Sequence, residues 1–153
     1  MGLRITPLQP IRYWIRVTAL IAFAMFVVIL VCLGFAFAVG LEFTIPTIPP
    51  WRADTMFKHM CLRAPLLEEP IFRLVLCVPM TAAFGPTRTI IINGIVFAGA
   101  HFLWGNPGPD NFIAGYFLAW AYLKSGSLLV PVTLHFLGNL VAFAAQIAAW
   151  HYV

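Results

Sequence analysis

The feature that most constrains this chain is a group of charged residues inside an apolar stretch. The segment Ala64 to Phe84 is almost wholly apolar apart from Glu68, Glu69 and Arg73. A charged side chain within a membrane costs about 2.5–3.5 kcal/mol on insertion scales, so such residues face a protein interior or a water-filled cavity and mark functional sites. The group therefore predicts a polar site inside a bundle of membrane-spanning helices.

The overall composition agrees with an integral membrane protein. Hydrophobic residues make up 62% of the 153 residues and charged residues only 9%, whereas soluble domains carry about 25% charged residues. The net charge of +4 is spread over helix ends and loops. This distribution argues against a nucleic-acid partner and favours contacts with anionic lipid of the bilayer.

Five apolar stretches have the pattern of membrane-spanning helices. The predicted spans are 13–40, 64–84, 89–104, 110–123 and 128–150. The third and fourth are short for a bilayer of about 30 Å, which favours local thinning or a water-accessible cavity. Prolines break the helix after the first span, and residues 51–62 can form a short interfacial helix. The sequence thus predicts an all-α, polytopic membrane helix bundle of about five transmembrane helices.

The basic residues favour a cytoplasmic N-terminus. In this orientation five of them lie inside, namely Arg4, Arg12, Arg16, Arg88 and Lys124, and three lie outside, namely Arg52, Lys58 and Arg63. Positively charged residues are in excess in cytoplasmic loops. The predicted protein is therefore multi-pass, with its N-terminus in the cytoplasm.

The charged group in the second span has an internal order. Glu69 and Arg73 are four residues apart, so on a helix they share a face. Pairing lowers the cost of placing them in a membrane and keeps the carboxylate ionised. Glu68 points about 100° away and is the candidate reactive carboxylate, suited to general-base catalysis. An ion pair that only fixes helix packing is the alternative interpretation.

Two more polar clusters lie in later spans. Phe97 and His101 share a helix face, and Asn93, two turns before His101, projects roughly the same way as a candidate partner. His135 and Asn139 form a pair four residues apart in the last span. An imidazole beside an amide makes a donor pair for a developing oxyanion, or equally an interhelical hydrogen bond.

The three clusters together resemble one family. Glu-Glu-x-x-x-Arg, Phe-x-x-x-His and His-x-x-x-Asn, in this order along the chain, are similar to the motifs of the CAAX-protease and bacteriocin-processing (CPBP/Abi) intramembrane proteases, which include the type II CAAX prenyl endopeptidases. The resemblance covers 64–141, including the stretch 122–131 before the third motif. Every motif position is filled, and the chain departs from the family in having few spans outside this core.

The resemblance implies a role for each motif residue. Glu68 and His101 would activate the attacking water, with Glu68 as general base. His135 and Asn139 would stabilise the oxyanion of the tetrahedral intermediate. The supporting residues would orient these four and wall the pocket; they are Glu69, Arg73 and Phe97.

The resemblance leaves the cofactor open, because family members are described both as glutamate-type and as metal-dependent proteases. Two histidines and a carboxylate are a plausible ligand set for a divalent metal such as zinc, and the candidates here are Glu68, His101 and His135. The His-x-x-x-Asn pair does not reproduce the His-Glu-x-x-His arrangement of many zinc proteases. No cofactor is therefore assigned.

The resemblance also implies a substrate and a location. We expect hydrolysis of a peptide bond in the C-terminal or juxtamembrane part of a membrane-associated peptide, of which prenylated CAAX tails are the family's eukaryotic example. The small size favours a bacterial plasma membrane, with a sorting signal as substrate. The predicted single membrane-embedded domain, 1–153, comprises a tail and first span (1–40), a catalytic core (64–141) and the end of the last span (142–153).

Two alternatives come from other functional classes. A non-catalytic bacteriocin-immunity-type membrane protein would keep this fold and bind a peptide, but it would have no reason to hold all four catalytic-type residues. A small transporter or proton channel would use the ionisable residues as a relay. A transporter typically has paired repeats, and the sequence contains none.

Overall fold

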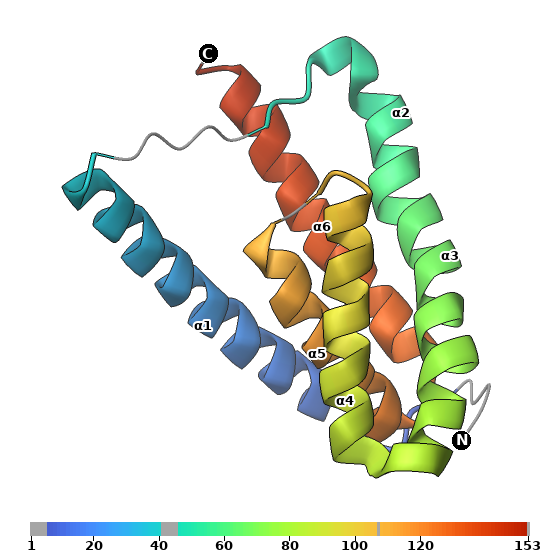
Figure 1. The fold of residues 1–153 in the computed structure, drawn as a ribbon. Helices are drawn as coiled ribbons and strands as arrows, with labels where there is room; N and C mark the ends of the chain where they lie inside the picture. Colours follow the sequence, from blue (N-terminus) through green and yellow to red (C-terminus); the bar gives the residue numbers. More distant parts are fainter. Residues whose placement is uncertain (1–5, 41–45, 107, 153) are drawn as a thin grey trace.

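The computed structural model describes residues 6–40, 46–106 and 108–152, which form an all-helical bundle with no strand in these ranges (Figure 1). The α-helices are α1 (Ile11–Ala38), α2 (Ala53–Phe57), α3 (Ala64–Glu69), α4 (Val78–Leu103), α5 (Pro109–Ser125) and α6 (Leu129–Trp150). A 3-10 turn, η1 (Pro50–Arg52), precedes α2. Two wider π-helical segments, η2 (Lys58–Arg63) and η3 (Pro70–Cys77), join α2 to α3 and α3 to α4.

The chain reverses its direction inside α4. Gly85 has φ 77° and ψ 168°, a conformation that glycine adopts without a steric penalty. The arm of α4 after Gly85 runs back alongside η3, as Figure 1 shows. This reversal is the predicted break between the second and third spans at Gly85 and Pro86.

The predicted all-α membrane fold is confirmed. Three helical stretches in the described residues are long and apolar enough to cross a membrane, at Ile11–Val28, Pro50–Leu103 and Leu129–Trp150. The middle stretch contains the Gly85 reversal, so it supplies both the second and the third predicted spans. The fourth predicted span is α5, whose 17 residues are fewer than the approximately 20 that a perpendicular span needs.

The structure corrects the prediction for residues 51–62. They are helical, but they do not form a separate short helix, because Arg63 and Ala64 keep helical backbone dihedrals and join η2 directly to α3. Moreover, η2 packs along α6. The sequence contains no glycine or proline between residues 51 and 64, so nothing interrupts the helix there.

The two π-helical segments explain how this long helix tolerates internal prolines. Pro65 and Pro79 each follow a π-helical segment by two residues. Proline has no N–H, and its ring clashes with the carbonyl four residues earlier in an α-helix. A wider turn moves that carbonyl away, and such turns recur at functional sites. Glu68 and Glu69 therefore lie on a continuous helix.

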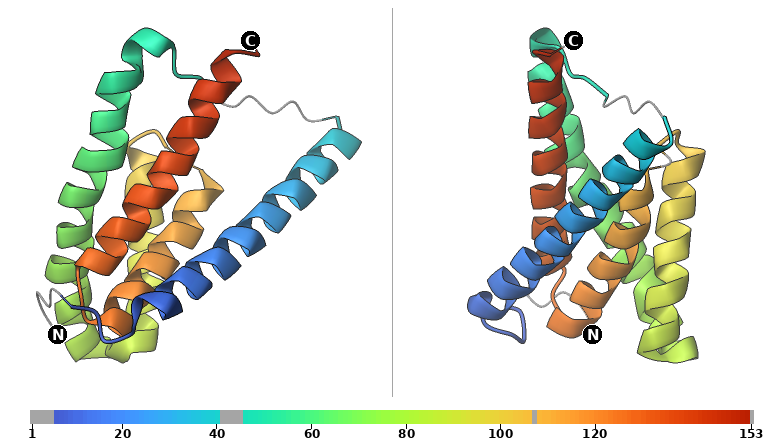
Figure 2. Two further views of the ribbon diagram at one scale, coloured as in Figure 1. Left: turned by 180° about the vertical axis from the view of Figure 1, so that it is seen from behind. Right: turned by 90° about the vertical axis from the view of Figure 1, so that its left-hand side faces the viewer.

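Helix α1 contacts the rest of the bundle mainly through its beginning. The Leu8 N–H donates a 2.9 Å hydrogen bond to the Ser125 carbonyl, and the Trp14 and Trp120 rings lie 5.8 Å apart. Among the described side chains of α1, only Trp14 is buried. Beyond these first turns the helix leans away from the others, as the left view in Figure 2 shows.

Helices α4 and α5 cross at two glycines. A Cβ atom on Gly115 would lie 2.9 Å from the Gly94 carbonyl oxygen and 3.0 Å from the Phe97 Cβ. A Cβ atom on Gly94 would overlap the ring of Tyr116. The close approach of the two helices therefore depends on small residues, as is common between membrane helices. This crossing holds Phe97 against its neighbours in the core.

We expect Gly115→Ala to destabilise the bundle by about 1–3 kcal/mol, because the added methyl group meets backbone rather than a flexible side chain. Unfolding of the detergent-solubilised protein by denaturant measures the change. Gly99→Ala is the matched control, since Gly99 lies in α4 and a Cβ there meets no atom within 4 Å. Equal midpoints for the two variants would show that the crossing is not tight.

Candidate active site

The three polar clusters of the sequence meet inside the bundle. Glu68 belongs to α3, His101 to the last turn of α4, and His135 to the second turn of α6. The Glu68 Oε2 atom lies 3.5 Å from His101 Nε2 and 4.0 Å from His135 Nε2. Side chains from three separate helices therefore surround one small volume.

The predicted ion pair forms beside this volume. Arg73 Nε donates to Glu69 Oε2 at 2.6 Å, and Arg73 Nη2 donates to Glu69 Oε1 at 3.4 Å. Both side chains have 0% exposure. A buried pair of this kind needs further hydrogen bonds to offset desolvation, and the structure provides them on both sides.

On the arginine side, the partner is Asn93 of α4. Arg73 Nη1 donates to Asn93 Oδ1, and Asn93 Nδ2 donates to the Phe72 carbonyl oxygen at 2.9 Å. The guanidinium carbon lies 5.4 Å from the ring centroid of Phe97 and 5.9 Å from that of Phe72, within cation–π range. The sequence suggested Asn93 as a partner of His101. The structure instead joins it to Arg73, because η3 packs against this arm of α4.

On the glutamate side, the partner is His135. Glu69 Oε1 and His135 Nδ1 are 2.8 Å apart. An ionised carboxylate only accepts hydrogen bonds, so Nδ1 carries the hydrogen and Nε2 points toward Glu68. Glu69 thus links Arg73 to one of the two histidines, a contact that motif spacing did not predict.

His101 is oriented in the same way by a backbone group. Its Nδ1 lies 3.0 Å from the Phe97 carbonyl oxygen, which can only accept, so Nδ1–H is the donor and Nε2 faces Glu68. The Phe97 ring stacks on His101 at 4.4 Å and contacts the His135 ring at 5.9 Å. The ring centroids of Trp104 and His101 lie 5.7 Å apart. Trp104 was not singled out in the sequence, although its position three residues after His101 indicated a shared helix face.

The two adjacent glutamates have different environments. Glu69 accepts hydrogen bonds from an arginine and a histidine. Glu68 Oε2 is buried and has no hydrogen-bond partner among the described residues, while the side chain as a whole is 17% exposed. A buried polar atom without a partner costs about 1–3 kcal/mol. Glu68 is therefore the carboxylate that is free to act on a molecule entering the site.

Asn139 lies one turn beyond His135 on α6. Its Nδ2 donates a 2.7 Å hydrogen bond to the carbonyl oxygen of Met60 in η2. In a π-helical turn this carbonyl would pair with the residue five positions on, but that residue is Pro65, which has no N–H. Asn139 thus supplies a donor that the backbone lacks. Its predicted contact with an oxyanion stays a prediction.

Comparison with known proteins identifies the family. The sequence model of the protein family described as "Type II CAAX prenyl endopeptidase Rce1-like" matches residues 50–141, more than half of the chain. The chain belongs to the Rce1-like family. The resemblance inferred from the three motifs is thereby confirmed, and the matched region contains every residue of the site described above.

A curated relative agrees with this assignment to the Rce1-like family. CAAX prenyl protease 2 of Caenorhabditis elegans is 36% identical over 103 residues, an alignment that covers 56% of this chain and 36% of the relative. The chain therefore spans about a third of the length of this curated relative. No solved structure matches the chain.

The geometry of this Rce1-like site also bears on metal binding. Glu68, His101 and His135 are suitable zinc ligands by chemistry, and metal-bound histidines commonly donate their other ring N–H to a carbonyl or carboxylate, as both do here. However, no group of three or more His, Cys, Asp or Glu side chains in the described ranges is arranged to hold a metal ion. The metal ligands suggested by the sequence, Glu68, His101 and His135, therefore stay a prediction.

Proposed function

We propose that this chain is an intramembrane endopeptidase that hydrolyses a peptide bond in a membrane-associated substrate. One observation carries the proposal: Oε2 of Glu68, which has no hydrogen-bond partner among the described residues, faces the Nε2 atoms of His101 and His135 at 3.5 Å and 4.0 Å, inside a membrane helix bundle. Membership of the Rce1-like family supports the same activity.

In the proposed reaction Glu68 acts as the general base, and His101 helps to hold the attacking water. As the water oxygen bonds to the scissile carbonyl carbon, one water proton moves to Glu68 and the carbonyl electrons move to its oxygen. Glu68 then returns this proton to the leaving amine as the C–N bond breaks. Positioned proton transfer of this type contributes about 10²–10⁴-fold to rates.

The oxyanion would be held by His135 and Asn139. Because the Nδ1–H of His135 already donates to Glu69, donation to the oxyanion would require a hydrogen on Nε2. Asn139 has two amide hydrogens; one donates to Met60, and the second is the proposed donor to the oxyanion.

The proposed substrate is the C-terminal tail of a membrane-associated protein. The family description names prenylated CAAX sequences, and the name of the C. elegans relative does the same. A lipid-modified tail lies at the membrane surface, where a span as short as α5 favours local thinning of the bilayer. A sorting-signal peptide anchored in the membrane is the second substrate to be tested.

The function is tested by adding peptides to the purified protein in lipid vesicles. A farnesylated CAAX peptide, the same peptide without the lipid and a membrane-anchored sorting-signal peptide are offered, and mass spectrometry identifies the products. We expect cleavage of an anchored peptide and little or none of its soluble counterpart. Absence of any cleavage would contradict the enzyme proposal.

We further expect this cleavage to persist, within about twofold, in the presence of a strong zinc chelator, because general-base catalysis by Glu68 needs no metal. The rate of peptide cleavage before and after chelation measures the effect. A loss that added zinc reverses would overturn this expectation and show that the activity needs a metal, for which Glu68, His101 and His135 would be the candidate ligands.

A further inference from the structure

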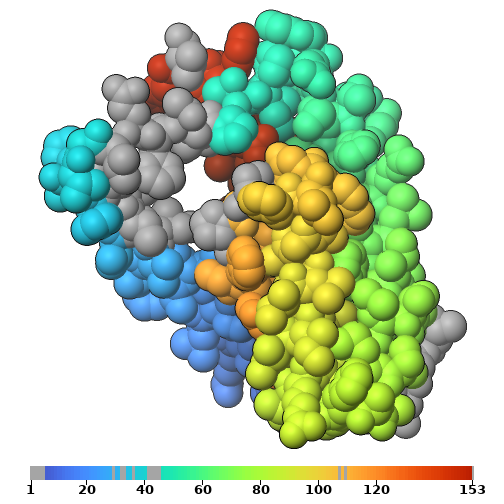
Figure 3. All heavy atoms as spheres, in the orientation of Figure 1, coloured from blue at the N-terminus to red at the C-terminus, as the bar shows by residue number. Residues whose placement is uncertain are grey.

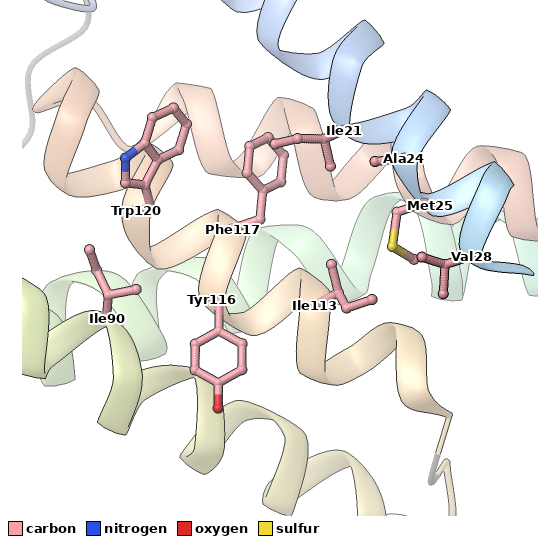
Figure 4. A pocket seen from close by; sticks show the side chains of 9 residues that line it. All are labelled: Ile21, Ala24, Met25, Val28, Ile90, Ile113, Tyr116, Phe117 and Trp120. Atoms are coloured by element: carbon pink, nitrogen blue, oxygen red, sulfur yellow. The ribbon is translucent and has the colours of Figure 1, made fainter.

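A second site lies away from the Glu/His cluster, between α1 and the rest of the bundle. A cavity of about 540 Å³ is lined by four residues of α1 between Ile21 and Val28, by Ile90 of α4, and by four residues of α5 between Ile113 and Trp120 (Figure 4). Its volume falls within the range of about 300–1,000 Å³ typical of small-molecule pockets. The three helices border one another on the face shown in Figure 3.

The lining has a regular pattern. The residues from α1 and those from α5 each follow the spacing i, i+3, i+4, i+7, which places them on one face of their helix. Two matching apolar stripes therefore face each other, yet an open space separates them because α1 leans away from the bundle beyond its first turns. In a membrane, such a space is filled by an apolar chain.

The end of the bundle nearest Trp14 carries positive charge. Exposed basic residues occur in the first two turns of α1, just after Gly85 and in the last turn of α5; they are Arg12, Arg16, Arg88 and Lys124. None of the described acidic residues lies at this end, since Asp54 and Asp110 begin the helices at the other end and the two glutamates belong to the central cluster. Arg4, also predicted on this side, lies outside the described residues.

The distance between the charges and the groove matches the shape of a phospholipid. Arg16 precedes Ile21 by five residues and Arg88 precedes Ile90 by two, so the groove begins within about 8 Å of the basic end at 1.5 Å per residue. From Ile21 to Val28 it extends about 10 Å further. Basic pockets between membrane helices on the cytoplasmic side bind anionic headgroups, and the predicted cytoplasmic N-terminus puts this end there.

We propose that the groove between α1, α4 and α5 binds an anionic glycerophospholipid. One acyl chain occupies the apolar cavity, and the phosphate contacts the basic residues Arg12, Arg16, Arg88 and Lys124. The lipid thereby fills the space between α1 and the bundle. This proposal stands apart from the peptidase proposal, because lipid binding requires neither Glu68 nor a substrate.

Native mass spectrometry of protein extracted from vesicles with equal amounts of phosphatidylglycerol and phosphatidylcholine tests the proposal. We expect retained phosphatidylglycerol to exceed phosphatidylcholine. Arg88→Gln and Lys124→Gln should each lower this preference about five-fold, since a basic residue near the headgroup contributes about 1 kcal/mol. The control Lys58→Gln removes an exposed charge that pairs with Asp54 at the other end and should leave the preference unchanged.

A second pair of variants tests the groove itself. Ala24→Phe adds a ring inside the cavity and should lower the amount of retained lipid, whereas Ala22→Phe adds the same ring on a face that does not line it. Equal retention by these two variants would overturn the proposal. Equal retention of the two lipids by the wild type, or retention of an isoprenoid in place of phospholipid, would also overturn it.

Discussion

Replacing Glu68 by glutamine is expected to lower the rate of peptide cleavage by about 10²–10⁴-fold without unfolding the protein. Glutamine has almost the same shape as glutamate but accepts no proton, so it removes the proposed base. The buried Oε2 of Glu68 has no hydrogen-bond partner in the described structure, so little stability should be lost. Cleavage of an anchored peptide in vesicles and the unfolding midpoint in detergent are measured on the same preparation.

A matched control separates this effect from a general loss of negative charge. Asp110→Asn makes the same chemical change at an exposed position in the first turn of α5, outside the Glu/His cluster, and should leave the cleavage rate unaltered. Full activity in the Glu68→Gln variant would remove the assignment of Glu68 as the base and, with it, the reaction proposed for this site.

Replacing Arg73 by methionine is expected to destabilise the protein by about 3–5 kcal/mol, because the carboxylate of Glu69 would remain buried without its counter-charge. The change also removes the donor to Asn93 and the contacts with the rings of Phe72 and Phe97. Denaturant unfolding in detergent measures the loss, and circular dichroism reports whether the helices persist.

The chain contains its own control for this prediction. Lys58 and Asp54 also form an ion pair four residues apart, at 2.7 Å, but their side chains are 66% and 76% exposed. Lys58→Met should cost only about 0.3–0.5 kcal/mol, as is typical of exposed pairs on helices. Similar losses for Lys58→Met and Arg73→Met would show that the buried ion pair stabilises the protein no more than the exposed one does.

A double variant tests the cause of the loss. Glu69→Gln combined with Arg73→Met removes both charges, so it should be less destabilising than Arg73→Met alone. A larger loss in the double variant would mean that the missing contacts, rather than the unpaired carboxylate, account for the effect.

Much of the fold follows from local features of the sequence. The lengths of the apolar stretches, the break between spans at Gly85 and Pro86, and the i, i+4 spacing of Glu69 and Arg73 are properties of neighbouring residues. Each is decided within one or two helical turns, so sequence alone predicted them. The three motifs likewise predicted which residues cluster, because their order resembles that of a known family.

The features that the sequence did not predict depend on how distant helices pack. The bond between Glu69 and His135 joins residues on α3 and α6, and the bond between Arg73 and Asn93 depends on the return of the chain after Gly85. Periodicity along one helix contains no information on the facing helix. It therefore suggested His101, which lies on the same helix, as the partner of Asn93. The continuation of residues 51–62 into α3 was missed because π-helical turns have no simple sequence signature.

Glu69 contacts both Arg73 and His135, and this double contact has a consequence for engineering the protein. A single oxygen, Oε1, lies within 3.4 Å of the guanidinium and within 2.8 Å of the imidazole. A substitution that draws this oxygen toward the arginine would strengthen the ion pair but lengthen the hydrogen bond that orients His135 for the proposed reaction. A gain in thermostability at this position should therefore be accompanied by a loss of turnover, as is common where a reactive centre and a structural contact coincide.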